Sequence, residues 1–79
     1  MLTPEIIRIC RLNLDLSQGQ LGRMAGLSGA TIGAIERHDR PLLPDVARRI
    51  RESIALTDDQ IEELVRVTKE IKKRGKNDG

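Results

Sequence analysis

Several polar side chains between residues 18 and 40 could bind a negatively charged partner. Gln18 has a long amide that can bind a phosphate or the edge of an adenine, and the hydroxyl of Thr31 can reach a phosphate. Arg37 and Arg40 carry guanidinium groups, which suit phosphate oxygens, and Arg23 can also reach a nucleic-acid backbone. These side chains are the candidates for contacts with nucleic acid.

No catalytic or metal-binding pattern accompanies these side chains. A nucleophile, a base and an orienting group do not occur together. His38 has no cysteine or second histidine nearby, so we expect it to be solvated and not to bind zinc. Four carboxylates fall in the first turns of an expected helix, where they suit the helix dipole: Asp58, Asp59, Glu62 and Glu63. We therefore expect no enzyme activity, no metal and no cofactor.

The composition describes one small domain without aromatic side chains. A chain of 79 residues has a limited core, which must be aliphatic here because Phe, Tyr and Trp are absent. Without aromatic rings, a single-strand binder that stacks bases is not expected. The net charge of +2 supports nucleic-acid binding only weakly. The chain has one cysteine, Cys10, so no internal disulfide can form. No apolar run is long enough to span a membrane and no signal peptide is visible, so we expect a cytoplasmic protein.

The apolar residues follow a helical period along the whole chain, and no segment alternates as a strand does. We therefore expect an all-α, compact five-helix bundle. The expected helices are residues 4–14, 18–25, 29–37, 44–54 and a fifth that ends before residue 74. Their expected caps are Thr3, Ser17, Ser28 and, in a capping box with Gln60, Thr57. Residues 1–73 should form the domain, and residues 74–79 a flexible basic tail.

The apolar positions also predict which side chains form the core. On the first helix, one stripe faces inward and a second stripe is expected to face outward: Ile7, Cys10 and Leu14 inward, and Ile6, Ile9 and Leu12 outward. The second and third helices should pack together through Leu21, Met24, Ile32 and Ile35. Between these two helices, Gly26 occupies a position suited to positive φ, which favours glycine.

Two helices joined by a short turn that begins with glycine are typical of a helix-turn-helix. The segment SQGQLGRMAGLSGATIGAIER resembles the helix-turn-helix of the lambda-repressor-like (Xre/Cro) family, and the resemblance extends over roughly residues 4–66. It matches in the paired Ser17 and Gln18, in the core positions, in the turn glycine and in the ending Glu36 and Arg37. The resemblance implies a structural ion pair between Arg11 and Glu36, with the helix-turn-helix on the second and third helices.

The same resemblance implies a sequence-specific regulator of transcription, most often a repressor, that inserts its third helix into the major groove of double-stranded DNA. The family's base-reading positions correspond to Gly29, Ala30 and Ala34, with Ser28 also facing the groove. None of these residues can donate the bidentate hydrogen bonds that distinguish bases. Specificity is therefore expected from methyl contacts, water bridges and DNA shape.

A short reading helix gathers little sequence information alone, so we expect a homodimer on a pseudo-palindromic site. The fifth helix is the first candidate for the dimer surface, through Ile61, Leu64, Val65 and Ile71. The outward stripe of the first helix is the second candidate. An alternative function is a protein-interaction module or antitoxin that keeps the fold, binds DNA weakly and contacts a protein partner through its first or fifth helix. Steep loss of DNA affinity with rising salt would favour the regulator.

Overall fold

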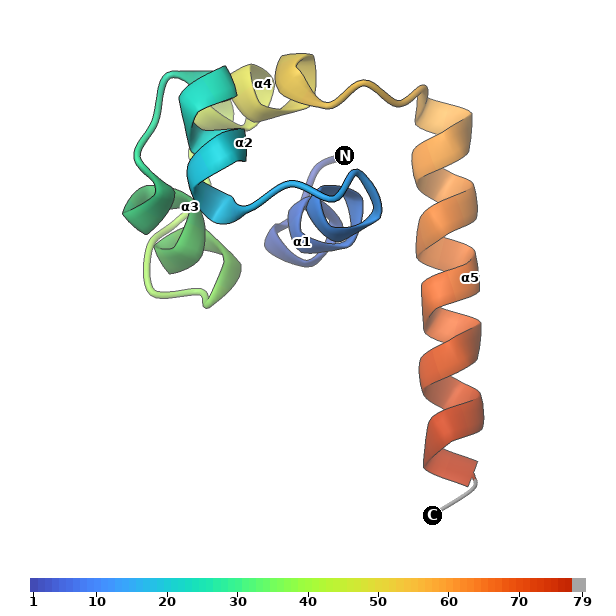
Figure 1. Ribbon diagram of the computed structural model, residues 1–79. Coiled ribbons are helices and arrows are strands. Elements are labelled where there is room, and N and C mark those ends of the chain that lie inside the picture. Colours follow the sequence, from blue (N-terminus) through green and yellow to red (C-terminus); the bar gives the residue numbers. More distant parts are fainter. Residues whose placement is uncertain (78–79) are drawn as a thin grey trace.

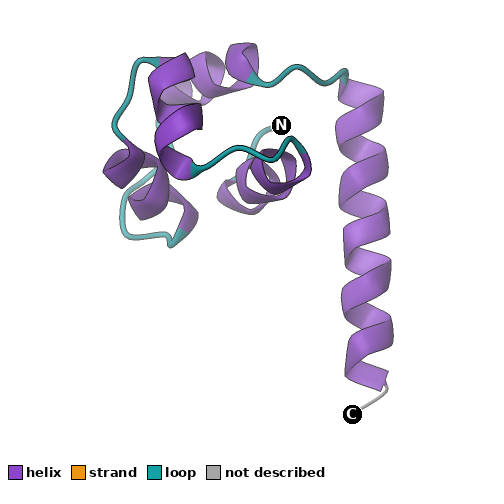
Figure 2. Ribbon diagram, viewed as in Figure 1, coloured by secondary structure: helices purple, strands orange, loops and turns teal. Residues whose placement is uncertain are grey.

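The computed structural model describes residues 1–77, and these residues form helices and no strand. Figures 1 and 2 show five helices joined by short connections. They are α1 (Pro4–Asn13), α2 (Gln18–Ala25), α3 (Gly29–Glu36), α4 (Pro44–Ser53) and α5 (Asp58–Asn77). The expected all-α fold of five helices is confirmed, and the first four helices lie within one residue of their expected bounds.

The fifth helix is longer than the sequence predicted. It continues through Asn77, whereas disorder was expected from Arg74. Arg74 and Lys76 are good helix formers and no proline interrupts this segment, so the helix can continue despite Gly75. Residues 78 and 79 lie outside the described residues. The division of the chain into a domain of residues 1–73 and a flexible basic tail stays a prediction.

Each expected cap forms a hydrogen bond that satisfies a free amide at a helix start. In α1, Oγ1 of Thr3 accepts from the amide of Ile6 at 3.2 Å. In α3, Oγ of Ser28 accepts from the amide of Thr31 at 3.0 Å. Reciprocal capping boxes start α2 and α5, formed by Ser17 with Gln20 and by Thr57 with Gln60. Polar caps therefore mark where four of the five helices begin, whereas α4 begins at Pro44 without a side-chain cap.

The core is aliphatic and draws on all five helices. Its buried members are Ile7, Cys10, Leu21, Ala25, Ile32, Ile35, Ile50, Ile54 and Ile61. Burying one large aliphatic side chain contributes about 1.5–3 kcal/mol, so this set supplies the main stabilisation of a chain without aromatic rings. Burial also raises the pKa of the Cys10 thiol, which keeps it protonated as a small apolar core residue.

Two core expectations are wrong. Met24 is 54% exposed, because the buried face of α2 is formed by Leu21, Gly22 and Ala25 and a helix turns by about 100° per residue. The outward stripe of α1 was also misplaced: Ile6 packs partly against the core, and Ile9 is only 7% exposed. The reason for Ile9 is that α5 packs on α1, where Ile9 lines a shallow pocket together with Thr68 and Lys72 of α5. Most of the second apolar stripe of α1 therefore serves packing.

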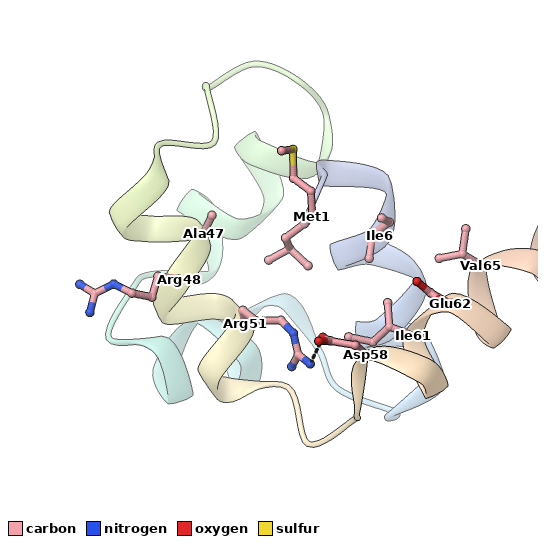
Figure 3. Close-up of a pocket in the computed structure, with 10 residues that line it drawn as sticks. Met1, Ile6, Ala47, Arg48, Arg51, Asp58, Ile61, Glu62 and Val65 are labelled. Atoms are coloured by element: carbon pink, nitrogen blue, oxygen red, sulfur yellow. Dashed lines mark hydrogen bonds and ion pairs between the residues drawn. The ribbon is translucent and has the colours of Figure 1, made fainter.

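Helix α5 packs against α1, and its carboxyl end reaches past the rest of the molecule (Figure 1). Between α1, α4 and the start of α5 lies a groove of about 600 Å³ with a largely apolar lining (Figure 3). Arg51 spans its floor and donates to Asp58 at 2.7 Å, which lowers the pKa of that carboxyl. Within residues 1–77, no helix is both long enough and apolar enough to cross a membrane.

Candidate nucleic-acid interface

The corner between α2 and α3 is formed by close contact between backbones. Gly26 has φ of 71°, the left-handed conformation that the sequence predicted there. A Cβ on Gly22 would lie 2.7 Å from the carbonyl oxygen of Leu27, and one on Gly29 would lie 2.9 Å from Cα of Gly19. Side chains at Gly22 and Gly29 would therefore force the two helices apart. This corner fixes the angle at which α3 leaves the body of the protein.

Arg11 and Glu36 form the expected ion pair and hold α1 to the end of α3. Nε of Arg11 donates to Oε2 of Glu36 at 2.8 Å, and Nη2 donates to Oε1 at 3.0 Å. The side chains are 10% and 3% exposed, and Nη1 of Arg11 also donates to the carbonyl of Leu16 at 2.9 Å. The hydrogen bond to Glu36 raises the pKa of the guanidinium. Both residues therefore have a structural role.

One face of α3 is open to solvent. Ile32 and Ile35 are buried against the core, whereas Ala30 is exposed and Ala34 is half-buried. Because residues four apart lie on one side of a helix, Ala30 and Ala34 form a continuous strip of methyl groups. The strip projects little from the backbone, so the helix can approach a partner surface closely.

Gly29 does not lie on this open strip. Its missing side chain would point at the backbone of Gly19, so the glycine serves the packing of α2 against α3. Of the three positions expected to read bases, Ala30 and Ala34 face outward, and neither side chain offers a hydrogen-bonding group. This distinction is not visible in the sequence, because it depends on how closely the two helices cross.

Polar groups border the alanine strip on both sides. On one side, Oγ1 of Thr31 interacts with Oγ of Ser28 at 2.9 Å and accepts from Nη1 of Arg40 at 3.2 Å. On the other side, Nε2 of Gln18 donates to Oε1 of Glu36 at 3.4 Å. Four of the predicted contact residues are thus brought to the edges of α3: Gln18, Ser28, Thr31 and Arg40. Another predicted contact residue, Arg37, caps the carboxyl end of α3.

Two further polar residues were not identified from the sequence. Asp39 accepts from Nε of Arg37 at 3.1 Å, and its own amide donates to the carbonyl of Ala34 at 2.8 Å. Arg49 of α4 donates to the carbonyl of Gly26 at 2.9 Å and supports the turn. The opposite charges of Arg37 and Asp39, two residues apart, were the only sequence signal for the first interaction.

Arg23, which the sequence predicted as a backbone contact, is exposed on α2.

The turn after α3 depends on a residue in the left-handed conformation. His38 has φ of 63°, and its amide donates to the carbonyl of Ile35 at 3.1 Å. Together with the bond from Asp39 to Ala34, this pairing closes the end of α3. His38 is exposed, and among residues 1–77 no cluster of three histidine, cysteine or carboxylate side chains could hold a metal ion.

A helix-turn-helix family model matches residues 7–61, which include α2, the turn and α3. The chain belongs to the Xre/lambda-repressor-like helix-turn-helix family. No curated protein and no solved structure matches the chain significantly. Membership makes the chain a DNA-binding helix-turn-helix regulator in general, and this family is regulatory rather than enzymatic. Helices α2 and α3 are therefore the candidate nucleic-acid interface.

Proposed function

We propose that this helix-turn-helix protein is a sequence-specific transcriptional repressor that inserts α3 into the major groove of double-stranded DNA. The observation that carries the proposal is the open alanine strip of α3, bordered by polar side chains at both edges. A smooth helix can enter the groove deeply, where Ala30 and Ala34 can touch thymine methyl groups. Arg40 can then contact a phosphate beside the groove.

The repressor is proposed to act as a homodimer through α5. Of the expected contact residues, Ile61 is only 8% exposed and belongs to the core, and Val65 packs partly against that core. Leu64 is half-buried and Ile71 is 64% exposed, so these two remain free to contact a second copy. On α1, only Leu12 of the outward stripe stays well exposed, at 53%. This distribution favours α5 over α1.

Substitution of Ile71 by aspartate tests the dimer. Because Ile71 is exposed, the variant should fold and shift the protein to monomer in sedimentation velocity at a fixed concentration. Lys69→Asp, at an exposed position elsewhere on α5, is the control and should sediment as the parent does. An unchanged sedimentation coefficient for Ile71→Asp would exclude this part of α5 as the contact.

Binding to duplex DNA is tested by a salt series combined with selection of bound duplexes from a random pool. A regulator should enrich a common sequence, and its affinity should fall steeply as salt rises because phosphate contacts release counterions. Reporter expression from a promoter that carries the enriched sequence then distinguishes a repressor from an activator. Failure to bind any duplex at low salt would contradict the proposed function.

A protein-interaction module or antitoxin is the second candidate. It is favoured by the lack of hydrogen-bonding side chains on the outward strip of α3 and by the exposed apolar side chains of α5, Val67 and Ile71. Such a module would bind a protein partner through these side chains, and it would bind DNA weakly and without preference for a sequence. Selection of duplexes from a random pool separates the two candidates, because only the regulator should enrich a common sequence.

A further inference from the structure

Gly33 lies beneath two polar side chains that come from different elements. It is buried, and a Cβ placed on it would lie 2.9 Å from Oε1 of Gln18 and 3.0 Å from Nη1 of Arg37. The missing side chain therefore leaves a notch in α3, into which the amide from α2 and the guanidinium from the end of α3 converge. This notch borders the open alanine strip, because Gly33 directly precedes Ala34.

A carboxylate orients each of the two side chains. Nε2 of Gln18 donates to Oε1 of Glu36, and since a carboxylate only accepts, Oε1 of Gln18 must point away from it, over Gly33. Asp39 accepts from Nε of Arg37, which leaves the two terminal nitrogens of the guanidinium available. Glu36 is itself held by Arg11, so the amide rests on a rigid support. The notch therefore presents an acceptor beside a donor.

We propose that Gln18 and Arg37, meeting over Gly33, act together as one reader of an adenine in the major groove. The inference rests on the proposed function. Adenine presents a donor at N6 beside an acceptor at N7, which matches Oε1 of Gln18 and a terminal nitrogen of Arg37. Guanine presents acceptors at both O6 and N7, so one of them would face Oε1 without a proton between them. The pair supplies the polar base contact that the outward strip of α3 lacks.

Gly33 is the residue that makes this arrangement possible. The atoms that a Cβ would meet are the far ends of two flexible side chains, not backbone atoms. Gly33→Ala should therefore push the amide and the guanidinium apart without disturbing the fold. Gly19→Ala makes the same chemical change close by, but there the added Cβ would meet only Oγ of Ser17, at 3.8 Å. These two variants form a matched pair.

The test begins with the parent chain and its selected duplex, in which each base pair is then varied singly. The parent should prefer adenine at one position by roughly 5- to 150-fold, the range for one good bidentate contact. Gly33→Ala should lose that preference and keep the parent's preferences elsewhere, while Gly19→Ala keeps all of them. A Gly33→Ala variant that is stably folded and still prefers adenine at that position would overturn the inference.

Two further variants assign the reading groups. Gln18→Ala should lose the preference at the same position as Gly33→Ala. Arg37→Lys keeps the charge but loses the flat fork of donors, so it should weaken the same preference without changing the salt dependence. If Gln18→Ala weakens all duplexes alike, or if Arg37→Lys binds as the parent does, these residues contact phosphates only and the inference is wrong. If the parent binds no duplex at all, the proposed function fails instead.

Discussion

The inner and outer sides of α3 are built by different means. On the inner side, Ile32 and Ile35 fill the core, Gly29 meets the backbone of Gly19, and Glu36 is bound by Arg11. On the outer side, α3 itself contributes only methyl groups, and the polar groups come from the start of α2 and from the loop after α3. The inner side depends on exact fit, whereas the outer side depends on side chains that can move. Substitutions on the two sides should therefore differ in what they disturb.

The largest effect is expected from Glu36→Ala, on the inner side. The variant leaves the guanidinium of Arg11 nearly buried without its charged partner, and breaking a buried pair in this way costs about 3–5 kcal/mol. Urea denaturation measures the free energy of unfolding. The control is Asp45→Ala, which removes an exposed ion pair with Arg48. Its urea midpoint should be nearly that of the parent. Equal midpoints for the two variants would show that Arg11 and Glu36 do not hold α1 to α3.

A smaller loss of stability is expected from Gly22→Ala at the helix corner. The new Cβ would lie 2.7 Å from a backbone oxygen and 2.9 Å from a backbone carbon, so the turn must shift. Overpacking of this kind costs about 1–3 kcal/mol, which exceeds the gain in helix propensity. Thermal unfolding of the parent and the variant measures the difference. A melting temperature at or above that of the parent would show that the corner has more room than these contacts allow.

Gly33→Ala, at the outer edge, should change stability in the opposite direction. Replacing glycine with alanine inside a helix gains up to about 1 kcal/mol, and here only the ends of Gln18 and Arg37 need to move. The same thermal measurement should therefore give a melting temperature equal to or higher than that of the parent. A clear decrease would mean that the outer edge is as tightly fitted as the inner corner, and the contrast between the two sides would be lost.

The smallest effect on stability is expected from Arg40→Ala, since its hydrogen bond to Thr31 is exposed. The free energy of unfolding of Arg40→Ala should equal that of the parent within the error of the measurement. In DNA binding, loss of one phosphate contact should weaken all duplexes alike and reduce the slope of log affinity against log salt by about 1. A slope equal to that of the parent would place Arg40 outside the interface.

The sequence predicted the inner side better than the outer side because the inner side depends on local rules. The caps Ser17 and Ser28, the turn glycine Gly26 and the periodic isoleucines follow from capping, backbone sterics and helical spacing, and these depend on neighbouring residues. Met24 was placed wrongly because adjacent apolar residues leave the orientation of a short helix open. Ile9 was placed wrongly because the covering helix, α5, lies far away in the sequence.

The outer side could be predicted only in part. The residue types at its edges, Gln18 and Arg37, were recognised as polar contacts from the sequence. Their convergence over Gly33 could not be recognised, because it depends on the distance between α2 and α3 and on the reversal of the chain at His38. In the same way, Asp39 and Arg49 acquire their roles only when distant backbone groups are brought to them.

The central claim is that the alanine strip of α3 enters the major groove, and a charge placed on that strip tests it most directly. The measurement is the affinity of two variants, Ala34→Glu and the more exposed Ala30→Glu, for the selected duplex at low salt. The control is Ala55→Glu, which adds the same charge at an exposed position between α4 and α5. The account predicts that both α3 variants remain folded and lose binding through repulsion from phosphates, while the control binds as the parent does. Folded α3 variants that bind as tightly as the control would contradict it.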